Sequence, residues 1–216
     1  DLWDAKYHNP IAVLGGLAAD RVAELMRDTA FLAPLDRVRG DLDRYLFLLN
    51  APGSGYGGLE HRWSSALICG RDNLPARGDE GVSEEYRTFL GLVSHEYFHL
   101  WNVKRMKPDV FTPFDLSQES HTNLLWVFEG ITSYYDDLAL VRSGMIEMES
   151  YLELLGQTIT RVNRSGGRRK QSVADSSFDA WTKFYKQYAN AANAIISYYS
   201  KGALIAFAVE LKLRAE

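Results

Sequence analysis

The stretch SHEYFHLWN, residues Ser94–Asn102, carries two histidines and a glutamate within five positions. The apolar residues around these three keep a helical period, so we expect the stretch to form an α-helix. Residues four apart project from the same face of a helix, so His95 and His99 can offer two imidazoles to one metal ion. Glu96 can then act on water without binding the metal. The alternative is that three polar residues merely share a helix.

A catalytic zinc site needs a third protein ligand and keeps one position open. Glu129, in WVFEGITSYYDDL (126–138), is the next candidate, because an unpaired carboxylate in an otherwise apolar helix is unfavourable to bury. The alternative is that Glu129 pairs with a buried Lys or Arg. Asp136 lies two turns further along the same face, where it is either a partner for a ligand histidine or a solvated charge.

Composition limits the class of protein. The chain has 216 residues, a net charge of -4 and 46% hydrophobic residues, which fits a soluble globular domain and disfavours nucleic acid as a partner. A single cysteine, Cys69, excludes an internal disulfide. We expect no transmembrane helix. Because the chain begins without a methionine and ends inside a helical pattern, we expect a piece of a longer protein. The compartment (cytoplasmic, periplasmic or secreted) and the oligomeric state stay open.

The order of predicted elements indicates an α+β fold. Residues 44–51 and 63–70 read as strands, since they are short, apolar and bounded by turn residues, and the glycine-rich 52–61 reads as their connection. We expect one domain, with a strand-containing lobe at about 1–80 and a helical lobe at about 81–216. Residues 165–171 are expected to form an exposed basic loop. The predicted helices are 17–33, 84–103, 122–141, 147–162, 177–187 and 191–213.

Four stretches together resemble the catalytic domain of thermolysin-like zinc peptidases, the gluzincins. The chain looks most like the glycyl aminopeptidase family, whose members commonly carry a PDZ domain after the catalytic domain. It resembles the aminopeptidase N family more distantly, through that family's GxMEN, HExxHxW, NEG and YxKG motifs in the same order. The resemblance implies a catalytic-domain fragment, without the N-terminal β-domain and the PDZ domain of the parent. The stretches are YGGLEHRWS (56–64), SHEYFHLWNVKR (94–105), WVFEGITSYYDDL (126–138) and YYSKGAL (198–204).

The resemblance also implies roles for single residues. It implies one Zn²⁺ on His95, His99 and Glu129, with Glu96 as the general base. Tyr199, at the tyrosine of YxKG, matches the residue that stabilises the oxyanion, because a phenol can donate a hydrogen bond where negative charge develops. Core packing is the alternative for Tyr199, and Tyr198 is then the replacement.

The GGLEH stretch matches the loop that makes such enzymes exopeptidases. Gly57 and Gly58 would let a substrate backbone approach closely, and Glu60 would bind the free α-amino group. Leu59 and His61 stand where the aminopeptidase N pattern has Met and Asn, although GGLEH suits the glycyl family. The alternative is a turn with Glu60 exposed.

The resulting hypothesis is a zinc-dependent aminopeptidase acting on peptides with a free N-terminus. A preference for Gly or Ala as the first residue is implied by the family resemblance alone. Two alternatives remain. One is an endopeptidase with the same metal centre and no anchor for the amino group. The other is a non-catalytic binding module that retains the fold.

Overall fold

The computed structural model describes residues 44–215, and the helix predicted at 17–33 lies outside them. The chain forms two compact units. Of the described residues, the first contains 44–104 and 136–147, and the second contains 105–135 and 148–215. A small sheet and many helices make up the described part, which confirms the α+β class.

The sheet of the first unit has three strands, β1 (Leu46–Asn50), β2 (Tyr56–Glu60) and β3 (Ser64–Cys69), in the order β1-β3-β2. The central strand β3 is parallel to β1 and antiparallel to β2. Every second residue of β3 is buried, as expected for a strand with one face on the core. The strands predicted at 44–51 and 63–70 are therefore confirmed.

The prediction that 52–61 is only a connection is wrong, because its second half forms β2. Gly57 pairs with Ile68 and Leu59 pairs with Ala66 across the β2–β3 ladder. Glycine has a low strand propensity, so the sequence pattern hides this strand. This stretch is a strand because its backbone pairs with β3, which its side chains do not predict.

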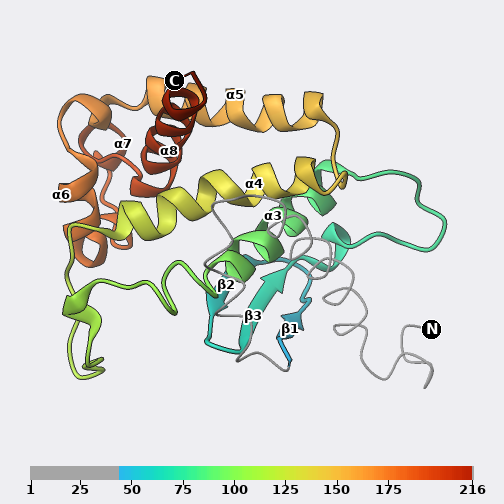
Figure 1. The fold of residues 1–216 in the computed structure, drawn as a ribbon, viewed down its shortest axis with the longest axis horizontal. Helices are drawn as coiled ribbons and strands as arrows, with labels where there is room; N and C mark the ends of the chain where they lie inside the picture. The colour runs from blue at the N-terminus through green and yellow to red at the C-terminus, as the bar shows by residue number, and fades with distance from the viewer. Residues whose placement is uncertain (1–43, 216) are drawn as a thin grey trace. The chain divides into compact units, whose positions relative to one another are not determined.

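Helix α3 (Glu84–Phe98) packs against β2 and β3 (Figure 1). Ser83 caps its first turn by accepting a hydrogen bond from the Tyr86 amide at 3.1 Å. At the other end, the Tyr97 ring meets Tyr45 at 5.1 Å and Trp101 at 5.4 Å between centroids. The helix was predicted to continue to residue 103 but ends at Phe98, so its last turn lies beside the sheet.

Helix α4 (Ile131–Arg142) changes unit between Tyr135 and Asp136. Its second half is joined to α3 by the Ser94 hydroxyl, which donates to the Asp136 carbonyl at 3.0 Å. This bond helps to hold the Asp136 segment at the C-terminal half of α3.

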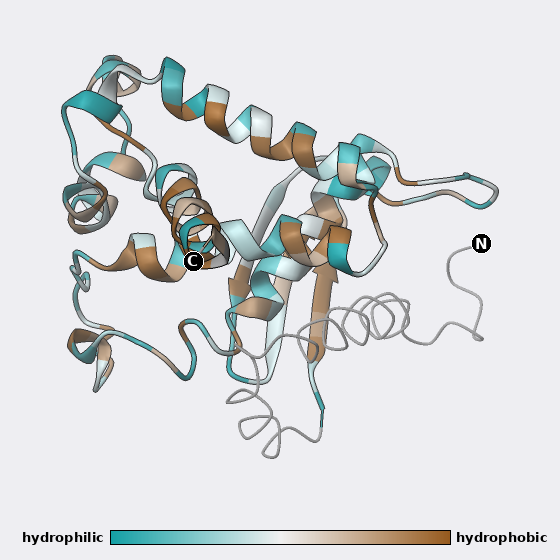
Figure 2. Cartoon of the chain, turned by 45° about the horizontal axis from the view of Figure 1, so that its top comes forward, coloured by the Kyte–Doolittle hydropathy of each residue, from teal (hydrophilic) through white to brown (hydrophobic). Residues whose placement is uncertain are grey.

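The second unit is helical. α8 contacts α5, α6 and the π-turn η5, and the amphipathic pattern of α5 is visible in Figure 2. The helix predicted at 147–162 is confirmed by α5, and the one at 122–141 begins later, as η5 and α4. The helical elements not yet given are η3 (Arg71–Asn73), η4 (Asp109–Phe111), η5 (Trp126–Gly130), α5 (Met148–Arg164), η6 (Gly166–Arg169), α6 (Val173–Phe178), η7 (Ala180–Phe184), α7 (Ala191–Ala194) and α8 (Tyr198–Ala215).

One prediction fails and a second is only partly met in the same place. The helix predicted at 191–213 is broken at Ile195, whose backbone is extended, and the Ile196 amide donates to Gln171 Oε1 at 3.0 Å. The stretch 165–171 is a 3₁₀ turn in part, with Gly167 buried against the Ile195 backbone. A tertiary contact thus replaces the helical bonds at this break, which local periodicity cannot show.

One stretch among the described residues, Ala191–Leu213, is long and apolar enough to cross a membrane by length and composition alone. The sequence was not expected to contain such a stretch. It includes α7 and most of α8, and α8 contacts α5, α6 and η5, so apolar residues here also serve packing within the second unit.

Candidate metal centre and catalytic residues

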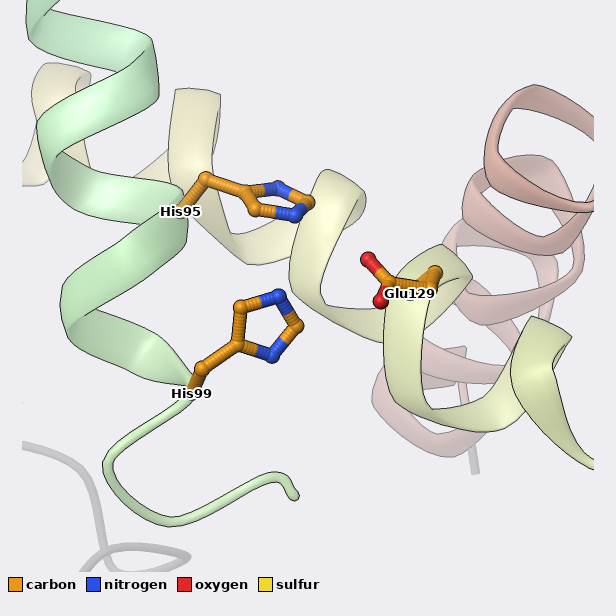
Figure 3. Close-up of side chains that lie close together, drawn as sticks. All are labelled: His95, His99 and Glu129. Carbon is orange, nitrogen blue, oxygen red and sulfur yellow. The ribbon is translucent and has the colours of Figure 1, made fainter. Parts of the chain in front are cut away.

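His95 and His99 project from the same side of α3 (Figure 3). Their ring centroids are 4.7 Å apart and the rings are nearly perpendicular, at 84°. His99 follows the last residue of the helix, yet its backbone stays helical and its amide donates to the His95 carbonyl at 3.3 Å. The spacing of four residues therefore places the two imidazoles together, as the sequence predicts.

Each histidine is held by an acceptor at Nδ1. His95 Nδ1 lies 2.9 Å from Asp136 Oδ2, and His99 Nδ1 lies 2.7 Å from the Asn102 carbonyl oxygen. With these acceptors the proton sits on Nδ1, and the lone pair of each ring is on Nε2, an atom that binds zinc. Burial raises the pKa of Asp136, and the hydrogen bond from His95 opposes this rise. The donor set of the first unit thus fits a metal ion.

Glu96, the predicted base, is only 5% exposed. Residues in and next to the sheet donate hydrogen bonds to its backbone carbonyl. The Leu100 amide donates to the Tyr97 carbonyl at 3.0 Å, and the Glu96 carbonyl lies in the last turn of α3, where sheet residues reach it. The Ser65 hydroxyl donates to it at 3.3 Å and the Tyr45 hydroxyl at 3.4 Å, and the two hydroxyls are 2.6 Å apart. Neither residue was a sequence candidate.

Gly58 lies directly against the side chain of Glu96. A Cβ at Gly58 would be 2.3 Å from Glu96 Oε1, far closer than two such atoms can approach. At Gly57 a Cβ would meet no atom within 4 Å. Of the two predicted glycines, Gly58 is therefore the one whose missing side chain makes room for the carboxylate of Glu96.

Glu60 lies beside the same group of residues. One carboxylate oxygen of Glu60, one of Glu96 and one ring nitrogen of His99 are all within 4.8 Å of one another. Glu60 Oε1 also forms an ion pair with Lys104 Nζ at 3.2 Å, and both side chains are about one-fifth exposed. Glu60 is thus partly buried at the end of β2, and Lys104 was missed because a lysine following a helix has no distinctive pattern.

In the second unit, Glu129 lies in η5 and Tyr199 in the first turn of α8. The two elements approach through a pair of glycines. A Cβ on Gly130 would lie 2.6 Å from the Gly202 Cα, and one on Gly202 would lie 2.8 Å from the Trp126 carbonyl oxygen. The glycines of the EG and YxKG motifs therefore face each other, which brings Glu129 and Tyr199 into one neighbourhood.

The two tyrosines of YxKG differ in exposure. Tyr198 is 1% exposed, whereas Tyr199 is half-buried. Burial raises the pKa of Tyr199, and the charge of Glu129 raises it further. The pKa of Tyr198 is also raised, mainly by burial. Both phenols therefore stay protonated at neutral pH, as a hydrogen-bond donor must.

A third phenol, Tyr185, was missed by the sequence analysis. The Tyr198 hydroxyl donates to the Tyr185 hydroxyl at 3.2 Å, and the Tyr185 and Tyr199 hydroxyls are also 3.2 Å apart. No motif contains Tyr185, so only the structure could reveal it.

By residue type alone, two histidines and a glutamate are candidate ligands for a divalent metal: His95, His99 and Glu129. The two histidines belong to the first unit and Glu129 belongs to the second.

A family model and a solved structure both match most of the described part of the chain. The model of the M61 glycyl aminopeptidase family matches residues 88–205, more than half of the chain. A second model, of a protein family of unknown function, matches residues 1–49. None of the curated proteins that were compared matches the chain.

One solved structure is similar over most of the chain. It is the crystal structure of an aminopeptidase N family protein from Idiomarina loihiensis, with 44% sequence identity and a TM-score of 0.84. The similarity covers 94% of this chain and 34% of that one, so the present chain spans about a third of that protein's length. With a family model matched over more than half of its length, the chain belongs to the M61 glycyl aminopeptidase family.

Proposed function

We propose that this chain is the catalytic part of a zinc-dependent aminopeptidase. One observation carries the proposal: two imidazoles on one face of α3 are both hydrogen-bonded at Nδ1, beside the buried carboxylate of Glu96. This is the arrangement expected of histidines that bind a metal through Nε2. Membership of a peptidase family supports the same chemistry.

His95, His99 and Glu129 would hold one Zn²⁺ ion, with Asp136 orienting His95. When bound, the ion would polarise the substrate carbonyl and make water more acidic. Glu129 is assigned as the third ligand because it precedes Gly130 in the motif that resembles the NEG sequence. Its neighbourhood to Tyr199 within the second unit agrees with this assignment.

The protein groups would act in a fixed order. Glu60 binds the free α-amino group of the peptide, as its place near Glu96 allows. Glu96 takes a proton from the attacking water while the new C–O bond forms, and Tyr199 donates a hydrogen bond to the carbonyl oxygen as it becomes negative. Glu96 then delivers the proton to the leaving nitrogen when the C–N bond breaks.

The preferred substrates would be peptides that begin with Gly or Ala. This part of the proposal comes from the family resemblance and is the one that substrate profiling tests most directly. The N-terminal β-domain and PDZ domain of the parent are proposed on the same ground.

The test combines metal analysis with hydrolysis. Purified protein should bind close to one equivalent of Zn²⁺, cleave substrates with N-terminal Gly or Ala, and lose activity on chelation. Glu96→Gln should retain the metal and lose about 10²–10⁴-fold in kcat. Glu149→Gln, on the exposed start of α5, is the matched control. Wild-type turnover by Glu96→Gln would remove Glu96 as the base.

A second variant separates an aminopeptidase from an endopeptidase. Glu60→Ala should lose cleavage of peptides with a free N-terminus and keep its zinc. Equal cleavage of free and N-terminally blocked peptides by wild type and variant would instead favour an endopeptidase. If the wild type binds zinc and cleaves neither, the fold serves as a binding module.

A further inference from the structure

Tyr185 has an unusual combination of exposure and hydrogen bonding. Its residue is 61% exposed, yet its hydroxyl oxygen lies 3.2 Å from the hydroxyl oxygens of both Tyr198 and Tyr199. Tyr198 is fully buried and Tyr199 is half-buried. The three phenols form one connected group within the second unit, in which Tyr185 is hydrogen-bonded to both of the others.

The number of hydrogens limits the directions that these hydrogen bonds can take. Each phenol has one hydrogen to donate and an oxygen that accepts. Tyr198 donates to Tyr185, so the hydrogen of Tyr185 can point to Tyr199. Either of these two hydroxyls can be the donor. When Tyr185 donates, the Tyr199 oxygen accepts and the Tyr199 hydrogen can turn to a substrate oxygen. A Tyr199 that donated to Tyr185 would have no hydrogen left for a substrate oxygen.

We propose that Tyr185 is a positioning residue that orients the hydroxyl hydrogen of Tyr199 for the reaction. The inference rests on the proposed function, in which Tyr199 stabilises the oxyanion. A hydrogen bond accepted by Tyr199 also polarises its O–H group, because hydrogen bonds in a chain strengthen one another. Tyr185 thus acts through Tyr199 and touches no reacting atom in this proposal.

A purely structural role for the Tyr185 hydroxyl is a poor explanation of the same geometry. The ring packs edge-on against Phe184 at 5.4 Å and is tilted against Trp181 at 6.4 Å, and both ring contacts survive replacement by phenylalanine. An exposed phenol contributes little to the core. Tyr185→Phe therefore removes the hydroxyl and leaves the packing in place.

The experiment is a double-mutant cycle of Tyr185→Phe and Tyr199→Phe, with Tyr188→Phe as the matched control. Tyr188 is 52% exposed and lies three residues further along the chain. Tyr185→Phe should lower kcat by about tenfold and leave KM within about twofold, as the loss of one oriented hydrogen bond predicts. The double variant should be no slower than Tyr199→Phe alone, and Tyr188→Phe should match the wild type.

Two kinetic outcomes overturn the proposal. The first is an unchanged kcat in Tyr185→Phe. The second is additivity, in which Tyr185→Phe slows the Tyr199→Phe background by the same factor as the wild type, because a residue that works through Tyr199 cannot act when that hydroxyl is gone.

A measurement without turnover separates this inference from the proposed function. In metal-free protein labelled with ¹³C at Cζ of tyrosine, the Tyr199 signal is assigned by its loss in Tyr199→Phe. Tyr185→Phe should shift that signal and Tyr188→Phe should not. If the wild type is active but the Tyr199 signal does not shift in Tyr185→Phe, the role of Tyr185 is refuted and the proposed function stands. A zinc-loaded wild type that cleaves no N-terminal residue removes the proposed function and the catalytic role of Tyr185 with it.

Discussion

The two units hold their candidate catalytic residues by different means. In the first, polar partners hold them: Asp136 at His95, the Asn102 carbonyl at His99 and Ser65 at the Glu96 backbone. In the second, Glu129 and Tyr199 depend on a close backbone approach at two glycines. A site held by polar partners can lose one and still fold. A close backbone approach leaves no room for even one methyl group.

The largest effect is expected where the second unit is tightest. Gly202→Ala places a Cβ 2.8 Å from the Trp126 carbonyl oxygen and 2.9 Å from the Gly130 Cα, both of which are backbone atoms. Overpacking of this kind costs about 1–3 kcal/mol or more, and it should also displace Tyr199. We expect a clear fall in Tm and loss of most activity. Thermal unfolding and kcat measure the two effects.

Gly156→Ala is the control for that substitution. Gly156 lies in α5, and a Cβ there would meet nothing within 4 Å. Alanine is favoured over glycine in a helix by about 0.5–1 kcal/mol, so Gly156→Ala should be as stable as the wild type or more so. If Gly202→Ala behaves like Gly156→Ala, η5 and α8 do not need the glycine pair.

Gly58 extends the comparison, because it is a glycine of the first unit that also has no room for a side chain. Gly58→Ala puts a Cβ against the movable carboxylate end of Glu96 rather than against backbone. We expect the fold to survive and kcat to fall about 10²-fold, since the carboxylate must leave its position. Gly53→Ala, where a Cβ has open space, is the control. A large fall in Tm for Gly58→Ala would contradict this reading.

Asp136 tests whether the polar partners in the first unit hold its candidate metal ligands. Asp136→Asn removes the negative charge from the partner of His95 Nδ1 but keeps an acceptor oxygen. Loss of such a partner weakens metal binding by about 10–100-fold. A chelator competition titration measures the zinc Kd, with Asp72→Asn, an exposed change in the same unit, as the control. Unchanged zinc affinity would mean that Asp136 does not support a metal ligand.

The sequence predicted the parts of the site that depend on residue type and spacing. Two histidines four apart lie on one face of α3 because helical periodicity is local. The same reasoning failed at β2, whose glycines hide a strand, and at Ile195, where Gln171 replaces the helical bonds. Elements are thus predictable where local pattern and tertiary contacts agree.

The residues that the sequence analysis missed share one property. Each lies far along the chain from the residue that it contacts, or lies outside any recognisable motif. Tyr45 and Ser65 reach the Glu96 carbonyl across 51 and 31 positions, and Tyr185 reaches Tyr199 across 14. The Asn102 acceptor is a backbone carbonyl, which every residue has. A motif records the residues that carry the chemistry, and the groups that orient them are found only once the chain is folded.

The smallest predicted effect lies at Ser65, which is fully buried and donates to the Glu96 carbonyl. Ser65→Ala removes one donor from a helix end where Tyr45 still donates, so unfolding should become easier by only about 1 kcal/mol. A few-fold loss of kcat with unchanged zinc affinity would follow, because Glu96 loses part of its backbone support but the histidines keep theirs. Ser64→Ala in the same strand is the control. Zinc affinity that falls together with kcat would show that the sheet supports the whole end of α3, and the polar partners of the first unit would then act as one network rather than separately.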